Sequence, residues 1–252
     1  MTGRERLEEE KSYIQNCERV TVAELSKNWG ITQETARRDL DKLEAEGLII
    51  RVHGGAIWNK TQGQDNIRFY ERQRHNTDAK RMIAINAAEL IRNSGTILAD
   101  SSTTVVEAMK MVAEDENLIV VTNSFDLCLE LSAAKMHIIS TGGNFNKHSM
   151  SFQGAIAKKT ITKYNVKLAV ISCKGLNMDK GVLDSYENEA EIKKAMIAQS
   201  EKVALLVDHN KFDKTAFLKI ADLDNIDYIV TDKKPSDAWI DICESKEIQL
   251  IY

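Results

Sequence analysis

Apolar side chains in the first sixty residues recur at helical spacing. Two sets lie three or four positions apart, namely Val22, Leu25 and Trp29, then Ala36, Leu40 and Leu43. Each set predicts a helix with one buried face, and a further helix is expected before them. Thr21 and Thr32 stand at the N-cap positions of the two helices, and Glu24 completes a capping box with Thr21. The pattern therefore predicts three short helices.

A short turn and a hairpin complete this first region. Trp29, Gly30 and Ile31 join the second and third helices, which is the arrangement of a helix-turn-helix. Residues 48–52 are expected to form a strand, residues 53–56 a Gly-rich turn, and a second short strand is expected to end near Trp58. The pattern predicts a winged helix-turn-helix domain over residues 1–58.

Beyond residue 79 the pattern changes to apolar runs that alternate with helices. Strands are expected at 96–99, 118–121, 137–139, 168–172, 203–207, 228–230 and 248–251, and helices at 79–92, 105–113, 125–133, 155–163, 187–200 and 236–245. Unbroken apolar strands separated by helices are typical of a parallel sheet that is covered on both faces. The fold class is therefore α/β, with a doubly wound second domain over residues 79–252. Residues 59–78, rich in Gln, Gly and charge, are expected to be a linker.

Composition narrows the functional classes. The chain has 252 residues, of which 43% are hydrophobic and 29% charged, so a disordered chain is excluded. No uncharged apolar run is long enough to cross a membrane, and the charged N-terminus does not resemble a leader, so we expect a cytoplasmic protein. The four cysteines have no paired spacing, and we expect neither a metal nor a cofactor. A net charge of −4 does not by itself favour a nucleic-acid partner.

The third helix nevertheless carries the side chains that read DNA. The candidate DNA contacts are Thr32, Gln33, Glu34, Thr35, Arg37 and Arg38 on this helix, with Arg51 and His53 on the wing. Arginine can bridge guanine O6 and N7 or hold a phosphate, glutamine can pair with adenine, and threonine can meet the thymine methyl group. A solvated charged helix with ordinary i, i+4 ion pairs is the alternative. The turn, the wing and the excess of basic residues from Arg51 to Arg81 favour a recognition helix that enters the major groove of double-stranded DNA.

Polar clusters follow the expected strands of the second domain. The candidate ligand-binding residues among them are Asp100, Ser101, Ser102, Thr103, Thr104, Thr122, Asn123, Gly142, Gly143, Lys174, Asp208 and Lys211. Asp184 is a further candidate, near the start of the helix expected at 187–200. Ligands of open α/β sheets bind outside the carboxyl ends of the strands, so these clusters are expected to converge on one crevice. Residues 101–104 start a helix, where free backbone N–H groups favour a phosphate, although an ordinary N-cap is the alternative. Lys174 is a cation suited to an anionic ligand, and carboxylates suit sugar hydroxyls.

The first region also contains a long motif. From Val20 to Ala56 the chain holds Val-Ala-Glu-Leu, Thr-x-x-Thr-Ala-Arg-Arg-Asp-Leu-x-x-Leu-x-x-x-Gly-Leu-Ile and His-Gly-Gly-Ala. This string resembles the DeoR family of bacterial sugar-metabolism regulators, and the resemblance continues to about residue 233. It implies a transcriptional regulator, usually a repressor, whose sensor resembles the ribose-5-phosphate isomerase fold and responds to a phosphorylated sugar. It also favours Glu189 as a ligand or switch residue, while Ser102 departs from the Gly that the family often has.

Three functions follow as hypotheses. The first is a repressor of a carbohydrate-utilisation operon, a homo-oligomer, dimer or tetramer, that binds a double-stranded DNA operator under the control of a sugar phosphate. The second is an aldose-ketose phosphate isomerase with Asp184 or Glu187 as the proton-transfer carboxylate. The third is an oligomeric scaffold that binds no sugar phosphate. We expect a regulator and not an enzyme, because an isomerase has no need of a DNA-binding domain.

Overall fold

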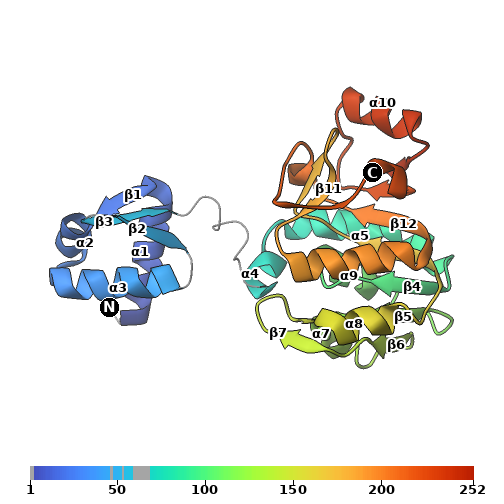
Figure 1. The fold of residues 1–252 in the computed structure, drawn as a ribbon, viewed down its shortest axis with the longest axis horizontal. Coiled ribbons are helices and arrows are strands. Elements are labelled where there is room, and N and C mark those ends of the chain that lie inside the picture. Colours follow the sequence, from blue (N-terminus) through green and yellow to red (C-terminus); the bar gives the residue numbers. More distant parts are fainter. Residues whose placement is uncertain (1–2, 46–47, 53, 59–68) are drawn as a thin grey trace. The chain divides into compact units, whose positions relative to one another are not determined.

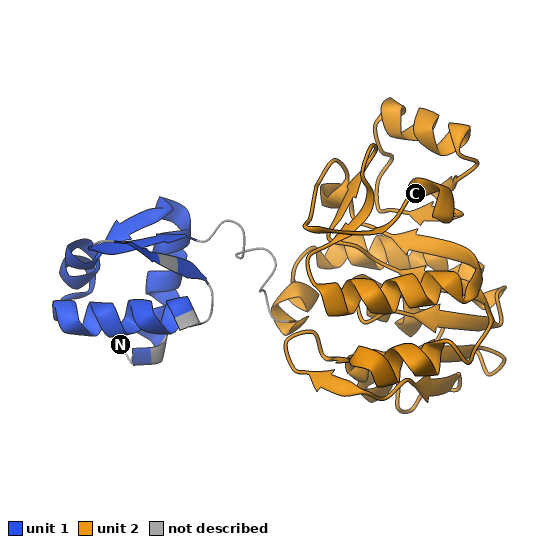
Figure 2. Ribbon diagram, in the orientation of Figure 1, with its two compact units in different colours: residues 1–67 blue, residues 68–252 orange. Residues whose placement is uncertain are grey.

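The computed structural model describes residues 3–45, 48–52, 54–58 and 69–252. The chain divides into two compact units, residues 1–67 and 68–252 (Figure 2). The expected linker, 59–78, lies partly outside the described residues. Its last part, from Phe69, belongs to the second unit and is helical.

The first unit combines helices with a small antiparallel sheet (Figure 1). In chain order its elements are α1 (Gly3–Cys17), β1 (Arg19–Thr21), α2 (Val22–Trp29), α3 (Gln33–Ala45), β2 (Ile49–Val52) and β3 (Gly55–Trp58). Among the described residues the strands lie in the order β1-β3-β2, so the expected hairpin β2–β3 gains a third strand, β1. We had expected no strand before α2, because a three-residue strand leaves almost no periodic signal.

Local sequence determines how the helices of this unit begin and end. The backbone N–H of Glu24 donates to the Thr21 hydroxyl at 3.2 Å, and that of Thr21 donates to the Glu24 carboxylate at 2.6 Å, which confirms the capping box. Gly30 ends α2 with φ of 62°, a left-handed conformation that costs glycine little. The apolar faces of α2 and α3 meet in one core, where Leu25, Ala36 and Leu40 are fully buried.

The second unit is built on a parallel sheet. Among the described residues seven strands lie in the order β15-β14-β12-β9-β4-β5-β6, and every pairing is parallel. They are β4 (Thr96–Ala99), β5 (Ile119–Thr122), β6 (His137–Ser140), β9 (Val166–Ile171), β12 (Ser200–Leu206), β14 (Tyr228–Val230) and β15 (Gln249–Ile251). The chain runs outward from β4 to β6, then returns to β9 and runs outward the other way. The switch point of this doubly wound sheet is therefore the gap between β4 and β9.

Helices cover both faces of this sheet (Figure 1). The helices are α4 (Phe69–Arg74), α5 (Thr77–Arg92), α6 (Thr103–Lys110), α7 (Phe125–Glu130), α8 (Gly154–Ile161), α9 (Glu187–Ala198) and α10 (Asp237–Ser245), with short 3-10 turns at His209–Lys211 and Leu223–Asn225. Alternate residues of one strand enter opposite cores, as with Ile97 and Leu98. Helices α5, α6 and α7 pack on one face, and α8, α9 and α10 on the other. The expected α/β fold is confirmed.

Two further β structures were missed from the sequence. A small antiparallel sheet joins β10 (Gly175–Asn177), β11 (Gly181–Asp184) and β13 (Leu218–Ala221), and a hairpin joins β7 (Asn144–Asn146) and β8 (Ser151–Gln153). Strands of three or four residues give too few alternations for a period of two to be recognised. Both structures follow strands of the main sheet in the chain, so they add material around the carboxyl ends of those strands.

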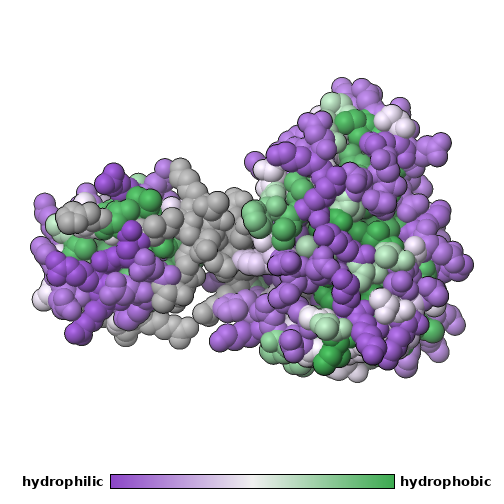
Figure 3. Space-filling view, viewed as in Figure 1, coloured by the Kyte–Doolittle hydropathy of each residue, from purple (hydrophilic) through white to green (hydrophobic). Residues whose placement is uncertain are grey.

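The surface of the second unit in the view of Figure 3 is largely hydrophilic and is interrupted by smaller hydrophobic patches. Within the described part of the chain, no helix is long and apolar enough to cross a membrane. No group of three or more His, Cys, Asp and Glu side chains is placed to hold a metal ion among these residues.

Candidate DNA-binding and effector sites

Helix α3 presents a charged face to solvent. The side chains of Arg37 and Arg38 are 52% and 74% exposed, and each lies near the Glu34 carboxylate, at 3.8 Å and 3.6 Å. Ion pairs this exposed contribute little to stability, so both arginines can exchange Glu34 for a phosphate or a base. Gln33 is exposed beside them, in the first turn of the helix.

The other predicted DNA contacts are arranged differently. The Thr35 N–H donates to the Thr32 hydroxyl at 3.2 Å, so Thr32 caps α3 as predicted. Arg51 lies on β2 with its guanidinium 3.4 Å from the Asp41 carboxylate, and it donates to the Arg37 carbonyl at 3.4 Å. The strand therefore holds Arg51 against α3. His53 lies outside the described residues.

A buried ion pair fixes α3 on α1. Arg6 donates two hydrogen bonds, of 3.0 and 2.8 Å, to one carboxylate oxygen of Asp39, a residue of α3 that is 1% exposed. Glu10 lies fully buried beside this pair, and its pKa is raised to about 7 by burial and then by repulsion from Asp39. This contact orients the helix that carries Arg37 and Arg38.

In the second unit, Asp100 organises the switch point between β4 and β9. One oxygen of its buried carboxylate accepts from the Ser102 N–H at 2.8 Å and from the Ser102 hydroxyl at 2.5 Å. The other oxygen accepts from the Ser172 N–H, which follows β9, at 3.1 Å. The carboxylate therefore joins the ends of the two strands that border the switch point.

Lys193 connects Asp100 with Asp184. Its ammonium lies 2.5 Å from the Asp184 carboxylate and 3.5 Å from that of Asp100, and all three side chains are almost fully buried. Burial opposes the charge on each group, but the attraction outweighs it. The pKa of Asp184 is therefore lowered and the pKa of Lys193 is raised, with Asp184 as the larger attractive cause and Asp100 as the next. The ammonium and the two carboxylates therefore form one buried cluster that includes Asp100 at the switch point.

The start of α6 offers donors for an anion. Ser101, Thr103 and Thr104 are each about 6% exposed and surround the first turn of this helix, with Ser102 at the N-cap. The first N–H groups of a helix have no partner within it, and they attract negative charge. Thr122 serves a different purpose, because its hydroxyl donates to the Ala99 carbonyl at 2.8 Å and accepts from the Ser124 N–H. It holds β4 and β5 together.

Lys174 lies between β9 and β10, where attraction by nearby carboxylates does not outweigh the cost of burying its ammonium charge. Burial and then repulsion from Arg72 lower its pKa to about 8, against the weaker attraction of Glu189 and Asp184. Four side-chain atoms of the second unit are buried and have no hydrogen-bond partner among the described residues: Arg72 Nε, Asn123 Oδ1, Asp126 Oδ2 and Ser185 Oγ. Of these residues, Arg72 also repels the Lys174 ammonium.

Asp208 and Lys211 follow β12, as predicted. Asp208 is 4% exposed and caps the 3-10 turn by accepting from the Asn210 N–H at 3.0 Å. The charge of Asp208 attracts the Lys80 ammonium, whereas the charge of Lys211 repels the ammonium groups of Lys80 and Lys174. Gly142 and Gly143 follow β6 with positive φ of 61° and 119°, and a Cβ on Gly143 would lie 2.8 Å from the Gln153 carbonyl oxygen. Only glycine fits there.

Two of the cations that contribute to the basic excess from Arg51 to Arg81, namely Arg72 and Lys80, belong to the second unit. The buried Lys80 ammonium donates to the carbonyl groups at the end of α4, those of Arg72, Gln73 and His75. Lys193 is not among the candidate residues that the sequence pattern predicts. Lys193 lies four residues after Glu189, and residues i and i+4 share a helix face. This spacing indicates that Lys193 faces the same side of α9 as the candidate residue Glu189.

Family models match most of the chain. Residues 6–62 match the DeoR-like helix-turn-helix domain, and residues 75–233 match the DeoR C terminal sensor domain. The chain belongs to the DeoR family of transcriptional regulators. This DeoR-family protein therefore combines a DNA-binding helix-turn-helix domain with a sensor domain, and the predicted resemblance is confirmed.

Curated relatives of this DeoR-family protein span nearly its full length. The uncharacterised HTH-type transcriptional regulator YulB of Bacillus subtilis is 36% identical, over 92% of this chain and 89% of the relative. The L-fucose operon activator of Haemophilus influenzae is 31% identical, over 92% and 93%. The HTH-type transcriptional repressor GlcR of Bacillus subtilis is 31% identical, over 100% and 96%.

Solved structures also match this DeoR-family chain. Ribose 5-phosphate isomerase A from Methanocaldococcus jannaschii has 14% identity and a TM-score of 0.40, over 54% of this chain and 55% of that chain. The beta subunit of eIF2B from Chaetomium thermophilum has 18% identity and a TM-score of 0.47, over 68% and 54%.

Proposed function

We propose that this protein represses a carbohydrate-utilisation operon and that a phosphorylated sugar, bound in the second unit, controls its binding to DNA. One observation supports an effector site in the second unit. A buried triad of Asp100, Lys193 and Asp184 lies at the switch point of the sheet, with the hydroxyl-rich start of α6 and the poorly compensated Lys174 beside it. A phosphate would meet backbone donors and a cation there, and sugar hydroxyls would meet carboxylates and amides.

The names of relatives support the carbohydrate and repressor parts of the proposal. One relative is an activator of an L-fucose operon, and another is a transcriptional repressor. We further propose a cytoplasmic homodimer or homotetramer, because paired helix-turn-helix domains read two half-sites about one helical turn of DNA apart. Light scattering of the purified protein measures this assembly, and a strictly monomeric protein would contradict it.

The DNA-binding face is tested at its arginines. We expect Arg37→Ala and Arg38→Ala each to weaken binding to the upstream region of the protein's own operon by about 1–3 kcal/mol in a gel-shift assay. Arg81→Ala is the matched control, because Arg81 is also exposed but lies in the second unit. Equal DNA affinity in all three variants would contradict a role for α3 in the DNA interface. A wild-type protein that binds DNA without sequence preference would contradict the proposed function as a transcriptional regulator.

The effector is tested by thermal-shift screening of phosphorylated against unphosphorylated sugars. A ligand at 100 times its Kd stabilises the folded state by about 2.7 kcal/mol, which moves the Tm of a unit this size by several degrees. We expect such shifts only with phosphorylated sugars. Shifts with the unphosphorylated sugars alone would contradict the assignment of α6 as a phosphate site.

We infer that the crevice does not isomerise its ligand. The carboxylate of Asp184 is fully buried and paired with Lys193, and its lowered pKa makes it a weak proton acceptor. Glu187, the other proton-transfer residue considered, is exposed at the start of α9. Incubation with pentose and hexose phosphates is expected to leave them unchanged, and interconversion at a catalytic rate would refute the inference.

A further inference from the structure

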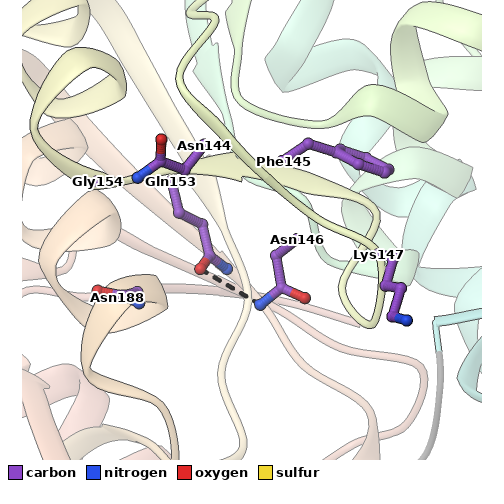
Figure 4. Close-up of a pocket in the computed structure, with 7 residues that line it drawn as sticks. All are labelled: Asn144, Phe145, Asn146, Lys147, Gln153, Gly154 and Asn188. Atoms are coloured by element: carbon purple, nitrogen blue, oxygen red, sulfur yellow. Dashed lines mark hydrogen bonds between the residues drawn. The ribbon is translucent and has the colours of Figure 1, made fainter.

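A cavity of about 570 Å³ lies beside the β7–β8 hairpin and the first turn of α9 (Figure 4). It is lined by Asn144, Phe145, Asn146, Lys147, Gln153, Gly154 and Asn188. Its size is within the range of small-molecule sites, roughly 300–1,000 Å³. Most of the lining side chains that can form hydrogen bonds are amides, and none is a carboxylate.

The hairpin that borders this cavity also carries part of an aromatic cluster, which includes the lining residue Phe145. Phe145 pairs with Phe152 across the two strands, and both rings contact Phe125, with centroids 5.1 and 6.1 Å away. Successive side chains of a strand point to opposite faces, so Asn144 and Asn146 lie on the other face. Figure 4 shows the Phe145 ring directed away from the Asn146 side chain. The aromatic contacts therefore hold the polar wall in place.

One part of the wall is fixed by hydrogen bonds. Gln153 is 5% exposed, and its amide nitrogen donates to the hydroxyls of Ser149 and Ser151 at 3.1 Å. Its amide oxygen accepts from Asn146 Nδ2 at 3.4 Å, and Asn146 Oδ1 accepts from the His148 N–H at 2.9 Å. A wall ordered before a ligand arrives loses little entropy on binding.

Two other amides are available to a ligand. The side chains of Asn144 and Asn188 are exposed and make no hydrogen bond within the described residues. An amide supplies both donors and an acceptor, which is the combination that a sugar hydroxyl requires. Lys147 adds a positive charge at the cavity. This chemistry fits a hydroxylated ligand that is neutral or anionic.

Both sides of the cavity border the candidate effector site. Beside β8, the Phe152 N–H donates to the Asn123 carbonyl at 2.7 Å, and Asn123 Nδ2 donates to the Phe152 carbonyl at 3.1 Å. Asn123 is the residue whose amide oxygen is buried without a partner. On α9, Asn188 directly precedes Glu189, whose charge acts on Lys174 and Lys193.

We infer that this cavity holds the hydroxyl-bearing part of the sugar phosphate and that Asn144 and Asn188 determine which sugar is accepted. The inference rests on the proposed effector function and adds its selectivity. The start of α6 binds the phosphate, which every candidate shares, whereas the amides contact hydroxyls whose configuration differs between sugars.

Isothermal titration calorimetry of the full chain tests this assignment. The probes are inorganic phosphate, glucose 6-phosphate, galactose 6-phosphate, ribose 5-phosphate and arabinose 5-phosphate. Asn144→Ala and Asn188→Ala are compared with Asn117→Ala, an exposed asparagine just before β5 and so at the opposite edge of the sheet. We expect each cavity variant to lose about ten-fold in affinity for the preferred sugar phosphate and to discriminate less between epimers. Inorganic phosphate should bind both within about two-fold of wild type.

The outcomes separate the two proposals. Wild-type selectivity retained in both cavity variants would overturn the cavity assignment and leave the effector function intact. A wild-type protein that binds none of the sugar phosphates would overturn the effector function, and the cavity assignment with it. A loss of phosphate affinity that equals the loss of sugar phosphate affinity would also contradict the assignment, because it would place the amides at the phosphate.

Discussion

Replacing Lys193 by methionine removes the cation that joins two buried carboxylates while nearly keeping the side-chain volume. The Lys193 side chain is 7% exposed, and the side chains of its partners Asp184 and Asp100 are 0% and 1% exposed. After the substitution both carboxylates stay buried, lose their counter-ion and repel each other. The substitution therefore raises the free energy of the folded second unit. It has little effect on the unfolded state, in which water solvates both carboxylates.

The expected loss follows from the two contacts, at 2.5 and 3.5 Å. One ion pair about 4 Å apart is worth about 4 kcal/mol at an effective dielectric constant of about 20. The variant no longer has to bury an ammonium group, and this saving in desolvation energy offsets part of the attraction that is lost. Removal of one partner from a buried pair costs about 3–5 kcal/mol, and we expect a loss in this range, or about 6–20 °C in Tm.

Urea unfolding followed by tryptophan fluorescence measures this loss. Trp239 is buried in the second unit, and the other two tryptophans, Trp29 and Trp58, lie in the first. Both are replaced by Phe so that Trp239 alone reports. Lys194→Met is the matched control, because Lys194 is 45% exposed and pairs only with Glu191 among the described residues. Its loss should stay below about 0.5 kcal/mol.

The pH dependence supplies a second check. The lowered pKa of Asp184 means that its pairing stabilises the folded state above its ordinary pKa of 3.8 and is lost as the pH falls through the folded value. In the wild type this contribution is lost only below pH 3.8, so the difference in stability between wild type and Lys193→Met should narrow as the pH falls below that value. Equal stability of the Lys193 and Lys194 variants at pH 7 would refute the reasoning.

Three further predictions concern other sites. Glu10 has a pKa of about 7 in the folded unit against 4.5, so the first unit should lose stability as the pH rises between these values, by up to roughly 3 kcal/mol. Glu10→Gln should abolish this dependence of the free energy of unfolding on pH, measured by urea titrations at several pH values. An unchanged pH dependence would contradict the assignment to Glu10. Thr21→Ala should lower the free energy of unfolding by about 1 kcal/mol, measured by thermal unfolding, whereas Thr21→Ser should retain most of the stability that the cap provides. Equal losses of stability in the two variants would contradict the role of the Thr21 hydroxyl as a cap. Iodoacetamide at pH 8 should modify exposed Cys17 but not buried Cys173, whose pKa is raised to about 12 by burial, and mass spectrometry that finds equal modification would contradict this.

Elements with a long or strongly patterned sequence were predictable. The capping box of α2, the turn at Gly30 and the runs that became β9 and β12 each depend on neighbours within a few residues. Strands β7 and β10 are too short for such a pattern, and they exist because tertiary contacts pair them with β8 and β11. Short strands gain their stability from the partner strand, which a local pattern does not contain.

The candidate site was predictable to a similar degree. Asp100 could be named because it follows an apolar run, and parallel strands bring their carboxyl ends to one edge. Asp184 instead ends β11 of the antiparallel sheet, so that rule does not place it beside Asp100. The partner that connects them, Lys193, is central to its helix, and no local rule states which helix face meets the crevice. The position of Thr122 after an apolar run predicts a ligand contact, and the structure adds that its hydroxyl joins β5 to β4.

Hydrophobic periodicity and helix caps, which act over a few residues, are enough to predict a helix-turn-helix domain followed by an α/β domain and the face of α3 that carries arginine. Which charges meet depends instead on the tertiary fold, in which Lys80 holds the end of α4 and Lys193 joins two carboxylates. The physical reason is that burial makes each charge costly unless a partner from a distant part of the chain compensates it, and the fold alone brings such partners together.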